Sequence, residues 1–89
     1  MADTRPIPLV VLSRQQDPVE IINSALRNAG HPVHCAWIRD LADLGDALGQ
    51  HSPQLIFMVL NDLEEARAAL ELRRRLATRV PTILVRDAL

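Results

Sequence analysis

Four short apolar runs recur along the chain at nearly even spacing. They cover residues 7–12, 33–38, 55–60 and 80–85, and none of them contains Asp, Glu, Lys or Arg. Short runs that are apolar on both faces and rich in β-branched side chains are typical of the buried strands of a parallel sheet. The pattern therefore predicts four strands.

The three segments between these runs carry the spacing and end signals of helices. In the first, apolar residues recur at helical intervals over about residues 18–29, with Asp17 as the expected cap and Gly30 as the stop. Asp40 is expected to cap a short second helix. The third opens at Asn61-Asp62 and has acids in its first turn and arginines in its last, the order that the helix dipole favours.

The alternation of strands and helices predicts the fold class. Strands that are apolar on both faces and separated by helices form an α/β fold, a parallel sheet with helices on both faces. The chain has 89 residues, which is enough for one small domain. Its 48% hydrophobic and 24% charged content is that of a folded protein rather than a disordered one.

Charge and cysteine content limit the partners and the compartment. The formal net charge is −1, which gives no electrostatic reason to expect a nucleic acid or a membrane surface as a partner. The single cysteine, Cys35, cannot form an internal disulfide. The longest apolar run, 55–60, is far shorter than the roughly 20 residues of a membrane-spanning helix. A cytoplasmic protein is expected.

The order of these elements, and several short sequences within them, resemble two-component receiver domains, which have the CheY-like fold. The similar segments are Leu9–Arg14, Arg27–His31, Pro53–Val59 and Arg79–Val85. The resemblance implies a flavodoxin/CheY-like parallel sheet of order 2-1-3-4 that lacks the final helix-strand-helix part. It also implies that residues 1–89 are a single truncated pseudo-receiver domain, the N-terminal part of a longer signalling protein.

The positions that carry the chemistry of a working receiver hold other residue types here. The resemblance places the Mg²⁺-binding acid pair on Ser13 and Arg14, the phosphoryl acceptor on Val59, and the switch Ser or Thr on Arg86. Mg²⁺ requires oxygen ligands, and an alkyl side chain cannot accept a phosphoryl group. The chain has no lysine to hold the phosphate. We therefore expect no phosphotransfer, no enzymatic activity, no metal and no cofactor.

Among degenerate receivers, the chain most resembles the N-terminal pseudo-receiver of FimX-like proteins. The similarity lies in the run Leu26–His31 and in the segment Asp40–Leu48, together with the acid-free pocket. It implies a role in a cyclic-di-GMP effector protein linked to type IV pilus function, in which another domain binds the nucleotide.

Three other groups of residues have structural interpretations. His34 and Cys35 are adjacent on a predicted strand and point to opposite faces, which does not suit a shared metal ion. Trp37 is expected to pack in the core. The run Arg73–Arg75 has no interleaved aromatic residues and has acids on the same helix, so we expect a solvated face rather than a nucleic-acid site.

The last predicted strand suggests how the domain acts. In a complete receiver another strand and two helices cover it, so Ile83, Leu84 and Val85 are expected here to be exposed. They would form an interface with protein, through a homodimer or by docking onto adjacent domains. Two alternatives stay open: a sensor of small molecules or anions, with Arg14 and Arg86 in the crevice at the strand ends, and a genuine phosphoreceiver.

Overall fold

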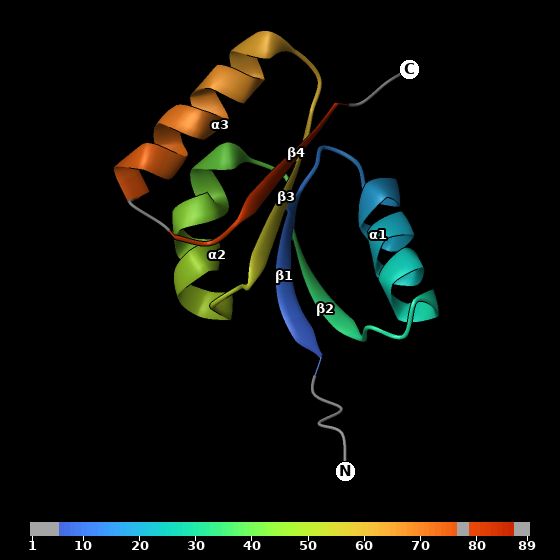
Figure 1. Ribbon diagram of the computed structural model, residues 1–89. Coiled ribbons are helices and arrows are strands. Elements are labelled where there is room, and N and C mark those ends of the chain that lie inside the picture. Colours follow the sequence, from blue (N-terminus) through green and yellow to red (C-terminus); the bar gives the residue numbers. More distant parts are fainter. Residues whose placement is uncertain (1–5, 77–78, 87–89) are drawn as a thin grey trace.

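A computed structural model describes residues 6–76 and 79–86 of the chain. Its four strands form one parallel sheet in the order β2-β1-β3-β4, with β2 and β4 at the edges (Figure 1). The predicted α/β fold and strand order are confirmed. The strands are β1 (Ile7–Leu12), β2 (Val33–Ile38), β3 (Leu55–Leu60) and β4 (Thr82–Arg86).

Strand β4 begins at Thr82 rather than at residue 80. Pro81 precedes it and has no N–H to donate to a ladder. Its carbonyl oxygen nevertheless accepts the N–H of Ile56 at 2.9 Å, so contact with β3 starts one residue before the strand.

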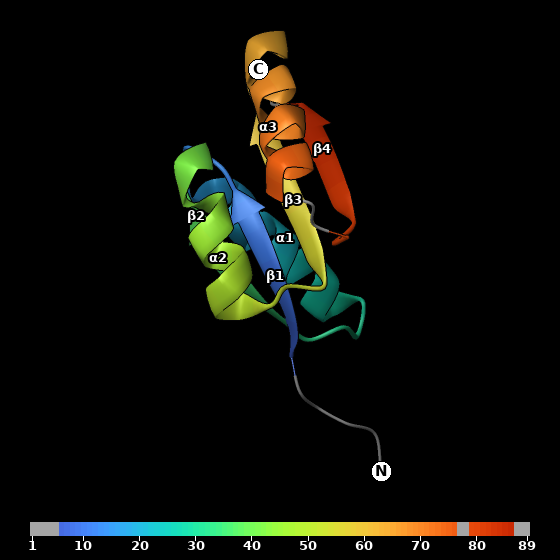
Figure 2. The same cartoon turned by 90° about the vertical axis from the view of Figure 1, so that its left-hand side faces the viewer.

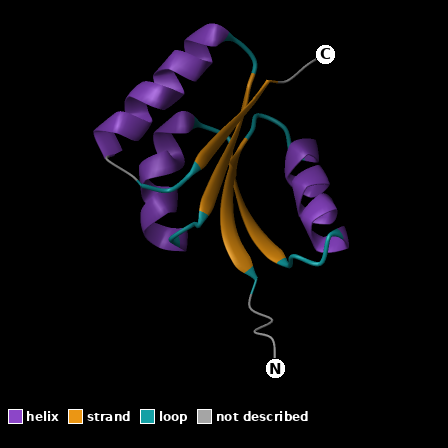
Figure 3. Cartoon of the chain, in the orientation of Figure 1, coloured by secondary structure: helices purple, strands orange, loops and turns teal. Residues whose placement is uncertain are grey.

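Helices cover both faces of the sheet. Helix α1 lies on one face, and α2 and α3 lie on the other (Figures 1 and 3). Figure 2 shows α2 in front of β1 and α3 beside β3 and β4. No helix in the described part of the chain is long and apolar enough to span a membrane. The helices are α1 (Asp17–Asn28), the short 3-10 helix η1 (Leu41–Asp43), α2 (Leu44–His51) and α3 (Leu63–Leu76).

The start of α1 differs from the prediction. Asp17 is the first residue of the helix, and Gln16 is the residue that precedes it. Gln16 already has helical backbone angles, and its carbonyl oxygen accepts the N–H groups of Val19 and Glu20. The helix therefore begins without a side-chain cap. Its end is as expected, because Gly30 has a φ of 86°, a left-handed conformation that favours glycine.

The starts of the next two helices differ from each other. Asp40 precedes η1, but its side chain makes no capping hydrogen bond. Asp62 does cap α3, because its Oδ1 accepts the N–H of Glu65 at 2.8 Å.

The hydrophobic core lies between the sheet and the helices α2 and α3. Strand residues with even numbers point into this core, and those with odd numbers, such as Leu9 and Val11, point toward α1 and are also buried. The strand residues of this core come from β1 and β3, because these central strands have neighbours on both sides. The core residues are Val10, Leu12, Ile56, Met58 and Leu60 from the strands and Leu44, Ala47 and Ala69 from the helices.

Trp37 does not pack in the core as expected. It lies on the edge strand β2, where its side chain is 38% exposed. The guanidinium of Arg39 lies 5.9 Å from the centre of the indole ring, a cation–π distance. The indole Nε1 donates to the carbonyl oxygen of Ser13 at 2.8 Å. The ring therefore ties the end of β2 to the loop after β1.

Candidate functional site

Three of the four receiver positions meet at the carboxyl ends of β1 and β3. Leu12 pairs with Met58 in the sheet. The residues that follow them, Ser13 and Val59, therefore lie side by side. Together with Arg14 they line a cavity of about 460 Å³ between the strand ends and the start of α1. This is the crevice in which doubly wound sheets bind their ligands.

This cavity offers no set of acidic ligands. Ser13 is only 3% exposed and Val59 is half-buried, so neither carries charge into the cavity. Asp17 is the one acid among the residues that line it. Within residues 6–76 and 79–86, no three His, Cys, Asp or Glu side chains are grouped so that they could hold a metal ion.

An ion pair crosses the position where a receiver would bind its metal. The guanidinium of Arg14 pairs with Oε1 of Glu65, and Oε2 of the same carboxylate accepts the N–H of Asn61 at 2.9 Å. The Glu65 side chain is 24% exposed and that of Arg14 is 69% exposed. The pair connects the loop after β1 with the first turn of α3, and it places a guanidinium at one of the two positions that the resemblance assigns to acids.

Glu65 was not expected from the sequence to belong to this site. Its place three residues after Asp62 is the spacing of a capping box, which predicts a role at the start of α3. The ion pair itself joins residues 51 positions apart in the chain. A local sequence pattern cannot predict a contact between residues so far apart.

The loop after β1 is held by three hydrogen bonds to Ser13. Its N–H donates to the carbonyl of Ile38 at 3.0 Å, its Oγ accepts the N–H of Gln15 at 3.2 Å, and its carbonyl accepts Trp37 Nε1. The position where a receiver has an acid therefore serves here to fix the backbone.

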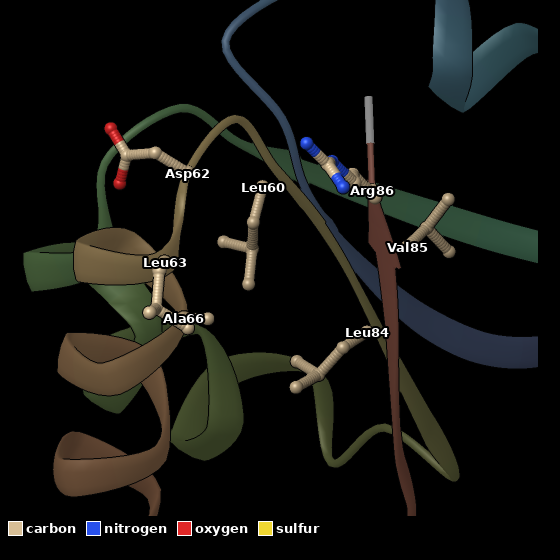
Figure 4. A pocket seen from close by; sticks show the side chains of 7 residues that line it. All are labelled: Leu60, Asp62, Leu63, Ala66, Leu84, Val85 and Arg86. Carbon is tan, nitrogen blue, oxygen red and sulfur yellow. The ribbon is translucent and has the colours of Figure 1, made fainter. Parts of the chain in front are cut away.

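Arg86 lies in a different cavity, of about 440 Å³, between α3 and β4 (Figure 4). The structure therefore does not bring Arg14 and Arg86 together. In Figure 4, Leu84 points into this cavity and Val85 points away from it. Most of the lining is apolar; it consists of Leu60, Asp62, Leu63, Ala66, Leu84, Val85 and Arg86.

The predicted interface residues are exposed but do not form one face. Ile83 is 43% exposed, Leu84 42% and Val85 39%. Successive residues of a strand point to opposite faces. Ile83 and Val85 are paired with Phe57 and Val59 and lie on the face of α1, whereas Leu84 lies on the face of α3. The three residues are thus exposed as expected, but they lie on both faces of the sheet and do not form one apolar patch.

The histidines and the cysteine show no arrangement for chemistry. The rings of His34 and His51 are 6.5 Å apart between centroids and are tilted by 50°. Burial raises the pKa of the Cys35 thiol, which keeps it protonated and weakly nucleophilic at neutral pH.

Arg73 differs from the rest of its arginine run. Its Nε donates to Oγ1 of Thr82 at 2.9 Å and its Nη2 to the carbonyl of Val80 at 3.3 Å. It therefore attaches the end of α3 to the start of β4. Arg74 and Arg75 are exposed, as expected for the whole run.

Comparisons with known proteins identify the fold. No protein-family model and no curated protein sequence matches the chain. A solved structure does: an aspartate-to-alanine mutant of the response regulator MaeR bound to sulfate, with 20% sequence identity and a TM-score of 0.74. The match covers 96% of this chain and 70% of that one. The described strands and helices thus have the arrangement of a flavodoxin/CheY-like fold without its final helix-strand-helix part.

Proposed function

We propose that this chain is a receiver-like module that cannot be phosphorylated and that acts by binding protein. One observation carries the proposal: Val59 and Ser13 lie together at the strand ends, and the nearby Arg14 is ion-paired with Glu65. The site thus holds an alkyl group, a hydroxyl and a neutralised cation. Phosphoryl transfer to a receiver needs an acceptor carboxylate and Mg²⁺ held by oxygen ligands.

In this proposal the ion pair takes the place of a bound metal at the strand ends. A bound divalent cation and its acids hold the strand ends and the following loops together. Here the Arg14 guanidinium bonds to Glu65, which in turn holds the Asn61 N–H. The loop before α3 is therefore held by groups of the chain itself. Binding of a partner protein would then not depend on phosphorylation.

Incubation with Mg²⁺ and acetyl phosphate tests this proposal. Intact-mass spectrometry should show no added phosphoryl group, while a phosphorylatable receiver domain in the same buffer gains one. The variant Val59→Asp should also stay unmodified, because Ser13 and Arg14 supply no acid pair for the metal. A phosphorylated species of the wild-type chain would overturn the proposal.

The wider setting of the module belongs to the same proposal. The similarity of Leu26–His31 and Asp40–Leu48 to FimX-like pseudo-receivers supports a place in a cytoplasmic cyclic-di-GMP effector linked to type IV pilus function. The module itself would have no enzymatic activity. Its partners would be protein surfaces, either a second copy or adjacent domains.

The arrangement gives less support to an anion sensor. That alternative relied on Arg14 and Arg86 acting together, and they line separate cavities. Arg14 is also neutralised by Glu65.

A further inference from the structure

We propose that the imidazoles of His34 and His51 bind a divalent transition-metal ion between them and so link the edge strand β2 to the end of α2. The centres of the two rings lie 6.5 Å apart, and the rings are tilted by 50°. His34 is the second residue of β2, whereas the receiver positions lie at the carboxyl ends of the strands. The pair is therefore a separate site, which depends neither on those positions nor on the edge of β4.

The fold places both rings on the same face of the sheet. Ala36 of β2 packs against the core under α2, and His34 points the same way because it lies two residues earlier on the strand. His51 is the last residue of α2 and lies one helical turn after the buried Ala47, so it also faces the sheet. In the sequence His34 adjoins Cys35, which points to the opposite face. The fold supplies His51 instead.

The ring nitrogens are available to a metal ion. His34 is exposed and His51 is half-buried. In the part of the chain that the structure describes, neither ring takes part in a hydrogen bond or an ion pair. Two imidazoles do not make a catalytic group, but each is a ligand that suits Cu²⁺, Ni²⁺ and Zn²⁺. Because no third His, Cys, Asp or Glu joins them among the described residues, solvent water would fill the remaining coordination positions.

The separation of the rings suits a shared ion. A metal–nitrogen bond of about 2.0–2.1 Å, added to the roughly 1 Å between a ring nitrogen and the ring centre, places each centre about 3 Å from the metal. Two rings on one ion then have centres about 5–6 Å apart, depending on the angle at the metal. The observed 6.5 Å requires only a small movement, which the exposed His34 side chain can make by rotating about its χ angles.

The electrostatics of the two elements favour a cation at this position. The last carbonyl groups of α2 carry the partial negative charge of the helix dipole, and His51 lies among them. Ser52, with a φ of 45°, ends the helix directly after it. Neither β2 nor α2 contains an arginine, so no fixed cation on these elements repels the ion.

Thermal unfolding of the untagged chain with Cu²⁺, Ni²⁺ or Zn²⁺ at neutral pH tests the site. All samples carry Cys35→Ser, so that the thiol neither binds nor reduces Cu²⁺. An ion that binds the folded chain raises the unfolding temperature by mass action. We expect a saturable rise that is largest with Cu²⁺, the ion with the highest affinity for nitrogen ligands, and no rise with Mg²⁺, which prefers oxygen ligands.

Substitutions of single histidines identify the ligands. His34→Gln and His51→Gln should each weaken the apparent affinity by about tenfold or more. The matched control is His31→Gln, because His31 is an exposed histidine in the loop before β2 and should contribute nothing. Broadening of the histidine ring signals in nuclear magnetic resonance spectra by substoichiometric Cu²⁺ locates the ion in the unaltered rings. We expect it at His34 and His51 and not at His31.

Two results would overturn the inference. One is the absence of a saturable response to any of the three transition metals. The other is a response that survives His34→Gln or His51→Gln, or broadening that is as strong at His31 as at the pair. The signal broadening does not depend on how stable the variants are, so a variant that unfolds still leaves the inference testable.

Discussion

Replacing Leu44 by alanine should lower the free energy of unfolding by about 2–5 kcal/mol, the range for removing a large buried aliphatic side chain. Leu44 is 0% exposed and lies at the start of α2, against the central strands. The cost includes the lost transfer free energy and a cavity that the short helix cannot close. A domain of this size is stable by roughly 4–13 kcal/mol, so the loss is a large share.

Urea unfolding followed by circular dichroism measures this effect. The matched control is Ile21→Ala, which also shortens an aliphatic side chain on a helix, but one that is 67% exposed. The control should change the free energy of unfolding by no more than about 0.5 kcal/mol. Similar losses in both variants would show that Leu44 is not part of the core described above.

Enlarging Ala69 to leucine should cost about 1–3 kcal/mol, the range for overfilling a packed core. Ala69 is 0% exposed and is the fully buried residue of α3, with Ala66 and Leu72 of the same helix also packed against the core. A larger side chain pushes α3 away from the sheet. The same helix carries Glu65, so the displacement should also weaken the ion pair with Arg14.

The neighbouring residue supplies the control for this prediction. Ala68 is exposed, and Ala68→Leu adds the same atoms one position along the helix. Urea unfolding should separate the two variants clearly, with Ala68→Leu close to the wild type. Amide exchange at Asn61, whose N–H is held by Glu65, should accelerate only in Ala69→Leu. Equal behaviour of the two variants would contradict the position given to α3.

Much of the fold could be predicted because it depends on local patterns. The apolar runs mark strands buried on both faces, and charge order and Asp62 mark the start of α3. The strand order followed from the family resemblance and is confirmed by the sheet. Periodicity alone would have left the order open, since it reports burial and not neighbours.

Predictions that depended on tertiary contacts were less successful. Trp37 has the kind of large apolar side chain that usually packs in a core, but its strand lies at an edge of the sheet and the residue is 38% exposed. Arg73 belongs to a charged run, yet its guanidinium reaches β4. The lack of acids at positions 13, 14 and 59 was visible in the sequence. The ion pair between Arg14 and Glu65 was not, because the two residues are distant in the chain.

The central claim is that the chain associates with protein without a phosphorylation switch. Sedimentation of the wild-type chain with and without Mg²⁺ and beryllofluoride, an analogue of a phosphoryl group bound to an acceptor aspartate, tests it most directly. We expect the same association constant with and without the two reagents. Ser13 and Val59 have no carboxylate to which Mg²⁺ or beryllofluoride could bind. A change in association that requires both Mg²⁺ and beryllofluoride would contradict the account.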